Sequence, residues 1–312
     1  MRIVAALGGN ALLRRGEALS AANQANNVRL AALSLAPLIE AGHELVITHG
    51  NGPQVGLLAL QAAAGPADGD QPLDVLDAQS EGMIGYLIER EMRNLLGPAR
   101  RVATLLTQVR VDPRDPAFGH PTKPIGPVHD DAGAARLSAR GFAVARDGKG
   151  WRRVVASPAP AEILVAPIVA DLVDAGALVI CAGGGGIPVV RDEAGHLQGI
   201  EAVIDKDLAS GLLARSLRAD LLMMLTDVEA VMLDWGRPEA RAITEAAPRA
   251  LAALDFAAGS MGPKVAAAVV FAEGGKGRAV IGRLQDAGAL VAGTAGTGIR
   301  EGAPGITCRT PS

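Results

Sequence analysis

Three glycine-rich turns follow apolar runs in this sequence. They are Gly8-Gly9-Asn10, His49-Gly50-Asn51-Gly52-Pro53 and Gly183-Gly184-Gly185-Gly186. Glycine lets backbone N–H groups converge on an anion, and a following helix adds the positive end of its dipole. A single such turn is weak evidence, because tight strand-to-helix turns favour glycine in any case. Three in one chain favour a phosphate or carboxylate site.

The spacing within these turns disfavours two common nucleotide-binding classes. None of them has the Gly-x4-Gly-Lys-Ser/Thr pattern of a Walker A loop or the dinucleotide fingerprint with its acidic partner. The positions of the histidines indicate neither a catalytic triad nor a metal cluster. His49 precedes the second turn, where it either lines the site or supports it by a structural hydrogen bond.

Lysine is rare in this chain. Only five of the 30 basic residues are lysine: Lys123, Lys149, Lys206, Lys264 and Lys276. A retained lysine marks a position that needs a compact point charge, and phosphoryl transfer needs such cations on the transferring group. Lys206 lies between two aspartates, and Lys264 would open a helix, where a cation calls for a nearby anion. Surface clusters are the alternative for both, and Lys149 and Lys276 have glycine-flanked, solvated contexts.

Short apolar runs alternate with helical patterns along the chain. Strands are predicted over 3–7, 44–48, 102–109, 177–181, 220–226 and 278–281, and helices over 20–41, 77–96, 161–175, 208–217 and 264–273. Ser20 is the predicted N-cap of the first helix. This alternation predicts an α/β fold with a mostly parallel sheet covered by helices on both faces.

Residues 111–160 interrupt this rhythm with seven prolines and several glycines. The segment is too long for an ordinary connection, so it predicts a protruding flap subdomain that carries Lys123. A variable surface insertion is the alternative. Residues 300–312 have little periodicity and are predicted to be a loosely held tail.

The composition excludes several other classes. The 312 residues carry a net charge of −3 and 2% aromatic residues, which disfavours nucleic-acid binding. No apolar stretch is long enough for a membrane span. Two distant cysteines, Cys181 and Cys308, predict a reduced, cytoplasmic protein.

The motifs, in their order, resemble the carbamate kinase family within the amino-acid-kinase superfamily. The matching stretches are ALGGNAL at 6–12, THGNGPQVG at 48–56, SEGMIGY at 80–86, TKPIGP at 122–127, AGGGGIP at 182–188, VIDKDLA at 203–209, LTDV at 225–228, GSMGPK at 259–264 and AGT at 295–297. They span nearly the whole chain, and together they are highly specific.

The resemblance implies a three-layer α/β/α sandwich, a homodimer, and reversible phosphoryl transfer between carbamoyl phosphate and MgADP that gives ATP and carbamate. It implies a single domain over 1–312. Residues 1–215 would bind carbamoyl phosphate, with the subdomain at 111–160, and residues 216–299 would bind the nucleotide. Mg²⁺ would be held mainly by nucleotide phosphates and water, without a ligand set from the protein.

The resemblance also implies roles for particular residues. The substrate would be held by Gly8, Gly9, Asn10, Gly50, Asn51 and Gly52 through backbone N–H groups. Lys123 matches a lysine that reaches from the subdomain onto the transferring group, Lys206 and Lys264 match the lysines that neutralise phosphate oxygens, and Asp207 matches the carboxylate that orients them. The nucleotide would contact Lys206, Thr226, Asp227, Val228, Met261 and Lys264.

The sequence departs from related patterns at a few positions. Acetylglutamate kinase and aspartokinase carry a lysine where Ala6 stands, and Lys123 would supply that charge here. Glu81 replaces a frequent glutamine, and Met232 lies where tyrosine is common. The alternatives are a related kinase for another small carboxylate or phosphonate, and a catalytically silent nucleotide-binding regulator.

Overall fold

The computed structural model describes residues 1–13, 16–18, 20–63, 71–257 and 261–309, and the side chains of residues 10, 11 and 63 lie outside this description. Gly259 and Ser260 of the GSMGPK motif, and the last three residues of the predicted tail, are therefore outside it as well. No helix in these ranges is both long and apolar enough to cross a bilayer.

A ten-stranded sheet forms the centre of the described chain, in the order β13-β14-β16-β15-β12-β1-β2-β9-β3, with β17 pairing β14. These strands are β1 Arg2–Leu7, β2 Glu44–His49, β3 Val102–Thr104, β9 Leu178–Ile180, β12 Leu221–Thr226, β13 Met232–Leu233, β14 Arg241–Ala246, β15 Arg278–Arg283, β16 Thr297–Ile299 and β17 Ile306–Cys308. The run from β15 through β12, β1, β2 and β9 to β3 is parallel throughout. This confirms the predicted mostly parallel sheet.

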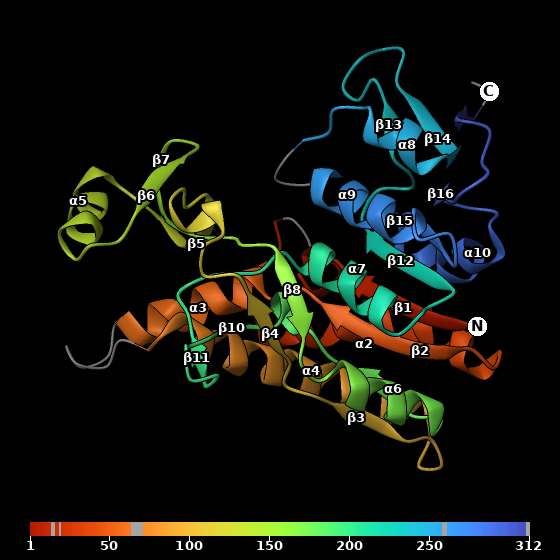
Figure 1. The fold of residues 1–312 in the computed structure, drawn as a ribbon, viewed down its shortest axis with the longest axis horizontal. Coiled ribbons are helices and arrows are strands. Elements are labelled where there is room, and N and C mark those ends of the chain that lie inside the picture. Colours follow the sequence, from red (N-terminus) through yellow and green to blue (C-terminus); the bar gives the residue numbers. More distant parts are fainter. Residues whose placement is uncertain (14–15, 19, 64–70, 258–260, 310–312) are drawn as a thin grey trace.

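Helices cover both faces of this sheet (Figure 1). The helices of the described chain are α1 Gly9–Leu12, α2 Ala21–Glu40, α3 Gly52–Ala63, α4 Leu73–Leu96, α5 Asp131–Ala139, α6 Ala166–Asp174, α7 Lys206–Ser216, α8 Pro248–Ala252, α9 Met261–Ala272 and α10 Ala287–Ala292, with short 3₁₀ turns at Pro116–Phe118, Gly183–Gly185 and Leu284–Asp286. Of these, α5 lies away from the central sheet. Ser20 caps α2 as predicted, since its Oγ accepts from the Asn23 N–H.

The side chains of β1 show how the sheet is buried. Val4 and Ala6 pack in one core with residues of α6, α7 and α9, whereas Ile3, Ala5 and Leu7 pack in a second core with α2, α4 and α10. Successive residues of a strand point to opposite faces, so a continuous apolar run is what a strand covered on both sides requires. The result is the predicted three-layer α/β/α sandwich.

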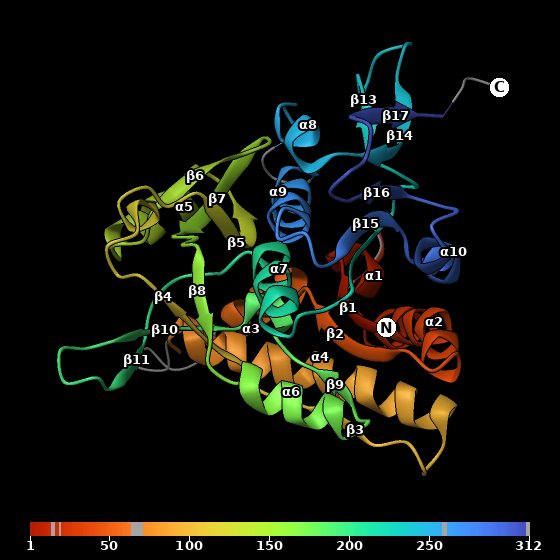
Figure 2. The same ribbon diagram turned by 45° about the vertical axis from the view of Figure 1, so that its right-hand side comes forward.

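Two smaller sheets stand beside the central one. The first has the order β11-β10-β4-β8, and the second, β5-β7-β6, packs with α5 to form a separate lobe (Figures 1 and 2). Their strands are β4 Gln108–Val111, β5 Lys123–His129, β6 Val144–Asp147, β7 Gly150–Val155, β8 Pro160–Ile163, β10 Ile187–Arg191 and β11 Leu197–Gly199. The lobe of residues 123–155, called the subdomain below, lies within the predicted 111–160 segment.

Two sequence predictions were wrong in this region. The predicted helix over 161–175 begins only at Ala166, because the preceding residues form β8 and pair antiparallel with β4. The predicted single strand over 102–109 is split into β3 and β4. Between them, the N–H of Thr107 donates to Glu81 and its Oγ accepts from Ala182, and these bonds turn the chain out of the central sheet. The helix predicted from residue 77 begins earlier, at Leu73.

Candidate active site

A cleft of about 1310 Å³ lies at the carboxyl ends of the central parallel strands. It is bordered by the turns after β1 and β2, the start of α7, the end of β12, the start of α9 and the first residues of β5. Ligands of open α/β sheets bind at this edge. Pockets for one small ligand usually measure about 300–1,000 Å³, so this cleft has room for two substrates side by side.

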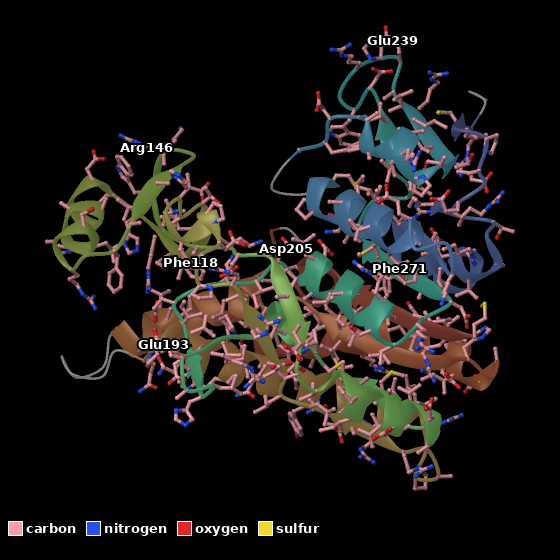
Figure 3. All side chains as sticks on the ribbon, in the orientation of Figure 1. Phe118, Arg146, Glu193, Asp205, Glu239 and Phe271 are labelled. Carbon is pink, nitrogen blue, oxygen red and sulfur yellow. The ribbon has the colours of Figure 1, made fainter. Side chains whose placement is uncertain are left out.

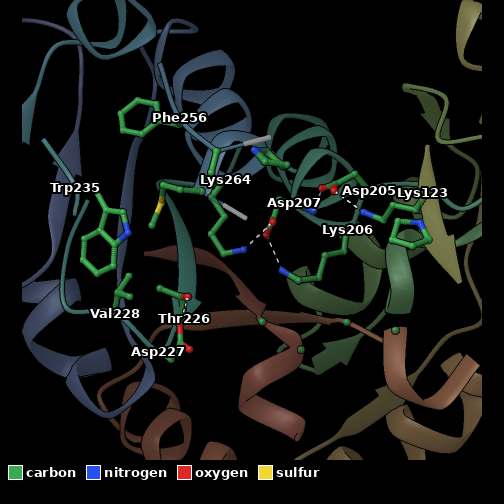
Figure 4. Close-up of a pocket in the computed structure, with 18 of the residues that line it drawn as sticks. Lys123, Asp205, Lys206, Asp207, Thr226, Asp227, Val228, Trp235, Phe256 and Lys264 are labelled. Atoms are coloured by element: carbon green, nitrogen blue, oxygen red, sulfur yellow. Dashed lines mark hydrogen bonds and ion pairs between the residues drawn. The ribbon is translucent and has the colours of Figure 1, made fainter. Parts of the chain in front are cut away.

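One carboxylate at the centre of the cleft bridges two lysines (Figure 4). Oδ1 of Asp207 lies 2.6 Å from Nζ of Lys206, and Oδ2 lies 3.0 Å from Nζ of Lys264. Both lysine side chains are only 14% exposed. Lys206 and Asp207 open α7, whereas Lys264 comes from the first turn of α9. A lysine near a helix N-terminus is expected to have an anion nearby, and for Lys264 this anion is Asp207.

Burial and charge act against each other in this cluster. Burial lowers the pKa of Lys206, the charge of Asp207 opposes that change, and the charge of Lys264 adds to it. Burial alone would raise the pKa of Asp207, but the two ammonium groups outweigh it and the pKa is lowered. The cluster holds two cations on one anion, so it carries an excess positive charge that suits a bound phosphate.

Lys123 joins this region from the subdomain. Its Nζ lies 3.0 Å from Oδ2 of Asp205, while Oδ1 of the same aspartate accepts from the Asp207 N–H and caps α7. Figure 3 shows Asp205 in the middle of the molecule, between Arg146 on the subdomain and Glu239 beyond β13. Asp205 was read from the sequence only as a neighbour of Lys206, although an aspartate just before a helix is a recognisable capping signal.

The first two glycine turns, which are predicted to hold the substrate, line the cleft. Gly8, Gly9, Gly50, Asn51 and Gly52 all border it, and the side chain of Asn10 lies outside the description. A Cβ on Gly50 would lie 3.2 Å from the Gly9 nitrogen and 3.4 Å from Cδ of Lys206, so the lack of a side chain on Gly50 lets the two turns and this lysine approach closely.

The third turn binds a carboxyl group that belongs to the chain itself. Glu81 on α4 is buried, and its two oxygens accept from the N–H of Gly183 at 2.8 Å and of Thr107 at 3.0 Å. Gly184 is the member of this turn that borders the cleft. His49 is fully buried, and its Nδ1 lies 3.1 Å from the Gly50 carbonyl oxygen, so it supports the second turn from behind.

The other half of the cleft holds its aromatic side chains, among apolar and charged residues. Thr226, Asp227, Val228 and Met261, which are predicted to contact the nucleotide, border this half. Trp235 and Phe256 border it too (Figure 4), and Trp235 is 75% exposed. Phe256 was not predicted as a site residue from the sequence. Aromatic residues make up only 2% of the chain, and this rarity could have drawn attention to Phe256.

Burial of Glu81 predicts a pH-dependent stability. Burial raises the pKa of Glu81 from 4.5 to about 7. The folded chain then binds this proton more tightly than the unfolded chain, so the free energy of unfolding falls as pH rises from about 4.5 to about 7. We expect Glu81→Gln to lack this fall, so that its stability relative to wild type rises by roughly 1–3 kcal/mol between about pH 5 and pH 8.

Urea unfolding at a series of pH values measures this difference. Glu40→Gln, an exposed glutamate at the end of α2, is the matched control. A Glu81→Gln difference that stays constant with pH would contradict the shifted pKa of Glu81.

The amino acid kinase family matches residues 1–283 of this chain, so the class of protein is that of the amino acid kinases. Carbamate kinase of Haemophilus influenzae is 54% identical over 308 residues, 98% of this chain and 99% of that protein. Carbamate kinase of Pyrococcus furiosus is 46% identical, over 95% of this chain and 98% of that protein. The structure of carbamate kinase from Giardia lamblia bound to AMP-PNP superposes with a TM-score of 0.90 at 41% identity, covering 96% of this chain and 98% of that one. Within the amino acid kinase family, the chain belongs to the carbamate kinases.

Proposed function

We propose that the cleft transfers a phosphoryl group reversibly between carbamoyl phosphate and ADP, giving ATP and carbamate. The observation that carries this proposal is the single carboxylate that bridges two buried lysines, Lys206 and Lys264, between glycine turns on one side and aromatic residues on the other. The glycine turns suit an acyl phosphate, and the aromatic half suits a nucleotide base.

The reaction requires little covalent chemistry from the protein. In the direction of ATP formation, a β-phosphate oxygen of ADP attacks phosphorus, and the bond from phosphorus to the carbamate oxygen breaks on the opposite side. Negative charge is spread over the three oxygens of the transferring group. Lys206 and Lys264 place positive charge there, Asp207 holds both ammonium groups in position, and the N–H groups of the turns after β1 and β2 hold the phosphoryl and carbamoyl groups.

Mg²⁺ fits this site as a companion of the nucleotide. Both oxygens of Asp207 are taken by lysines, and Asp205 is taken by Lys123 and the α7 cap. In the described ranges, no three His, Cys, Asp or Glu side chains come together as a metal cage. We therefore propose that Mg²⁺ is held mainly by nucleotide phosphates and water, where it screens their charge.

The two parts of the chain divide the substrates between them. We propose that residues 1–215 bind carbamoyl phosphate and residues 216–299 bind the nucleotide, with Lys264 reaching back from the second part to Asp207. The prediction of a loosely held tail over 300–312 was wrong for residues 306–308, which form β17 and pair antiparallel with β14 of the central sheet. Cys181 and Cys308 are free thiols, which agrees with the cytoplasmic location that we propose.

Formation of ATP tests the activity directly. MgADP and carbamoyl phosphate are mixed with and without the protein, and ATP is followed through a coupled dehydrogenase. ATP above the uncatalysed background supports the proposal. Folded protein that binds ADP but makes no ATP would redirect the search to another small carboxylate or phosphonate acceptor, or to a silent nucleotide-binding regulator.

Removing the subdomain lysine should separate catalysis from nucleotide binding. We expect Lys123→Ala to lower turnover about 10- to 100-fold, because one positive charge near the transferring group is lost. The Kd for ADP, measured by calorimetry, should change less than about threefold, because the nucleotide half lies away from the subdomain. Lys149→Ala, an exposed lysine of the same subdomain, is the control. A large loss of ADP affinity would contradict this role for Lys123.

An exposed apolar patch supports a homodimer. Met83 and Tyr86 on α4 and Leu106 before β4 form this patch, with Tyr86 59% and Leu106 54% exposed. A Cβ on Gly82 would lie 3.8 Å from Leu106, which places this leucine against α4. Contiguous exposed apolar residues of this kind often mark an interface, and we propose that a second copy of the chain covers the patch.

Charge introduced into the patch should break the dimer. We expect wild type to sediment as a dimer and Leu106→Asp to sediment as a monomer at micromolar concentration, because the dimer would bury the new carboxylate without a partner. Val270→Asp, at an exposed valine on α9, should stay dimeric. A Leu106→Asp protein that still sediments as a dimer would place the interface elsewhere.

A further inference from the structure

The side-chain amide of Asn51 is held by the helix behind it. Asn51 immediately precedes α3 and borders the cleft. Its Nδ2 donates to Oγ of Ser80 at 2.8 Å and to Oδ1 of Asp77 at 3.1 Å, both on α4. An amide nitrogen carries two hydrogens, so both are committed inside the protein. The amide oxygen is the polar atom of this side chain that remains for a ligand.

Ser80 determines which end of the amide faces inward. Its hydroxyl donates its only hydrogen to the carbonyl oxygen of Asp77 at 2.9 Å, so its Oγ can only accept from Asn51. A reversed amide would point its oxygen at the lone pairs of Ser80 and lose this bond. Gly184 has a φ of +69° and packs its bare Cα against the amide, where a Cβ would lie 2.2 Å from Nδ2. The amide is thus confined on a second side.

Asp77 is the second acceptor that holds the amide. It is 2% exposed, and its Oδ2 has no hydrogen-bond partner in the described chain. Burial raises the pKa of Asp77 well above its usual value, which favours the neutral carboxyl. Oδ1 accepts from Asn51 in this arrangement. The amide is therefore held from behind by two acceptors of α4, Ser80 and Asp77.

The geometry of in-line transfer places the leaving group near this amide. Attack by ADP comes from the aromatic half of the cleft, past Lys206 and Lys264, and the leaving carbamate must depart on the opposite side. The turn at Gly50-Asn51-Gly52 lies there, with Gly50 directly against Lys206. Carbamate differs from other small carboxylates by its amino group, which is a hydrogen-bond donor.

We propose that Oδ1 of Asn51 accepts a hydrogen bond from the amino group of carbamoyl phosphate and carbamate, and that Ser80 and Asp77 are positioning residues that aim this oxygen. This inference rests on the proposed function and adds a determinant of substrate specificity to it. An acyl phosphate with a methyl group in place of the amino group leaves the oxygen without a partner. Such a loss corresponds to about a tenfold to hundredfold preference for carbamoyl phosphate.

Acetyl phosphate is the probe that separates this role from a structural one, because it carries a methyl group where carbamoyl phosphate has NH₂. For each variant, the kcat/KM for carbamoyl phosphate in ATP formation is compared with the inhibition constant of acetyl phosphate in the same assay. Asn51→Leu removes the oxygen, and Ser80→Ala releases the amide. Ser34→Ala, which removes a comparable serine-to-backbone bond on α2, is the matched control. Calorimetry with ADP shows whether each variant retains its nucleotide site.

We expect Asn51→Leu to lower kcat/KM for carbamoyl phosphate about 30-fold or more, and to change the acetyl phosphate inhibition constant less than about threefold. Ser80→Ala should raise KM for carbamoyl phosphate about 3- to 10-fold with kcat nearly unchanged, since the amide then samples both orientations. Equal losses for both acyl phosphates would overturn the proposal. If Ser80→Ala keeps the wild-type preference for carbamoyl phosphate over acetyl phosphate, the positioning role of Ser80 is wrong. This measurement still decides the question if Asn51→Leu does not fold. A wild-type protein that makes no ATP would instead overturn the proposed function and this inference with it.

Discussion

Lys206→Ala is expected to lower the turnover of ATP formation at least about a hundredfold, because it removes a positive charge from the transferring phosphoryl group. Lys206 is 14% exposed and lies on the same carboxylate as Lys264, so water and mobile ions replace its charge poorly. The coupled assay measures this directly. Lys264→Ala, from the other helix, should produce a loss of similar size.

Exposed lysines supply the control for this result. Lys276→Ala lies in an exposed glycine-flanked turn and should keep wild-type turnover. Circular dichroism and ADP calorimetry show whether Lys206→Ala is folded and still has a nucleotide site. If folded Lys206→Ala retains turnover within a factor of a few of wild type, the assignment of Lys206 to the transition state is wrong.

Asp207→Asn is expected to affect both catalysis and stability. The substitution leaves two ammonium groups facing each other without the anion between them, and breaking a buried ion pair on one side typically costs about 3–5 kcal/mol. Because the lysines also lose their fixed positions, we expect turnover to fall about a hundredfold. Urea unfolding and the coupled assay measure the two effects, with Asp171→Asn, at an exposed aspartate of α6, as the control.

The pH profile of Asp207→Asn gives a second readout. Asp207 opposes the lowering of the Lys206 pKa by burial, so its loss should let Lys206 release its proton at a lower pH than in wild type. The alkaline limb of kcat should therefore move to lower pH. Asp207 also makes the stability of the fold depend on pH. The pKa of Asp207 is lowered in the folded chain, so its contribution to the free energy of unfolding is present near neutral pH and is lost as the pH falls below the usual aspartate range. An alkaline limb that does not move would mean that Asp207 has no influence on the charge of Lys206.

The strands and the lysines are the features that local sequence determines well. A strand buried on both faces must be apolar along its whole length, so β1, β2, β12 and β15 stand out as short apolar runs. Lys206 and Lys264 stand out because arginine replaces lysine nearly everywhere else. Their motifs, together with the glycine turns, carry the family resemblance that the comparisons confirm.

The helix and strand boundaries that were predicted wrongly are those that depend on contacts with residues far away in the sequence. Residues 160–163 have the composition of the helix that follows them, but they become β8 because β4 offers an open edge for pairing. The break between β3 and β4 likewise depends on Glu81, which lies 26 residues away from Thr107 and captures its N–H. Neither partner can be read from the residues at the boundary itself.

The chemistry of this protein can be read from its sequence, which shows the cations, the turns whose backbone can bind an anion, and the apolar runs that form the central parallel strands. How these groups meet depends on contacts between distant parts of the chain. Lys264 reaches Asp207 across 57 residues, Lys123 reaches Asp205 across 82, and Asn51 is oriented by Ser80 across 29. Such contacts arise because the packing of helices on a common sheet fixes the positions of residues far apart in the chain, whereas local sequence preferences act over only a few residues.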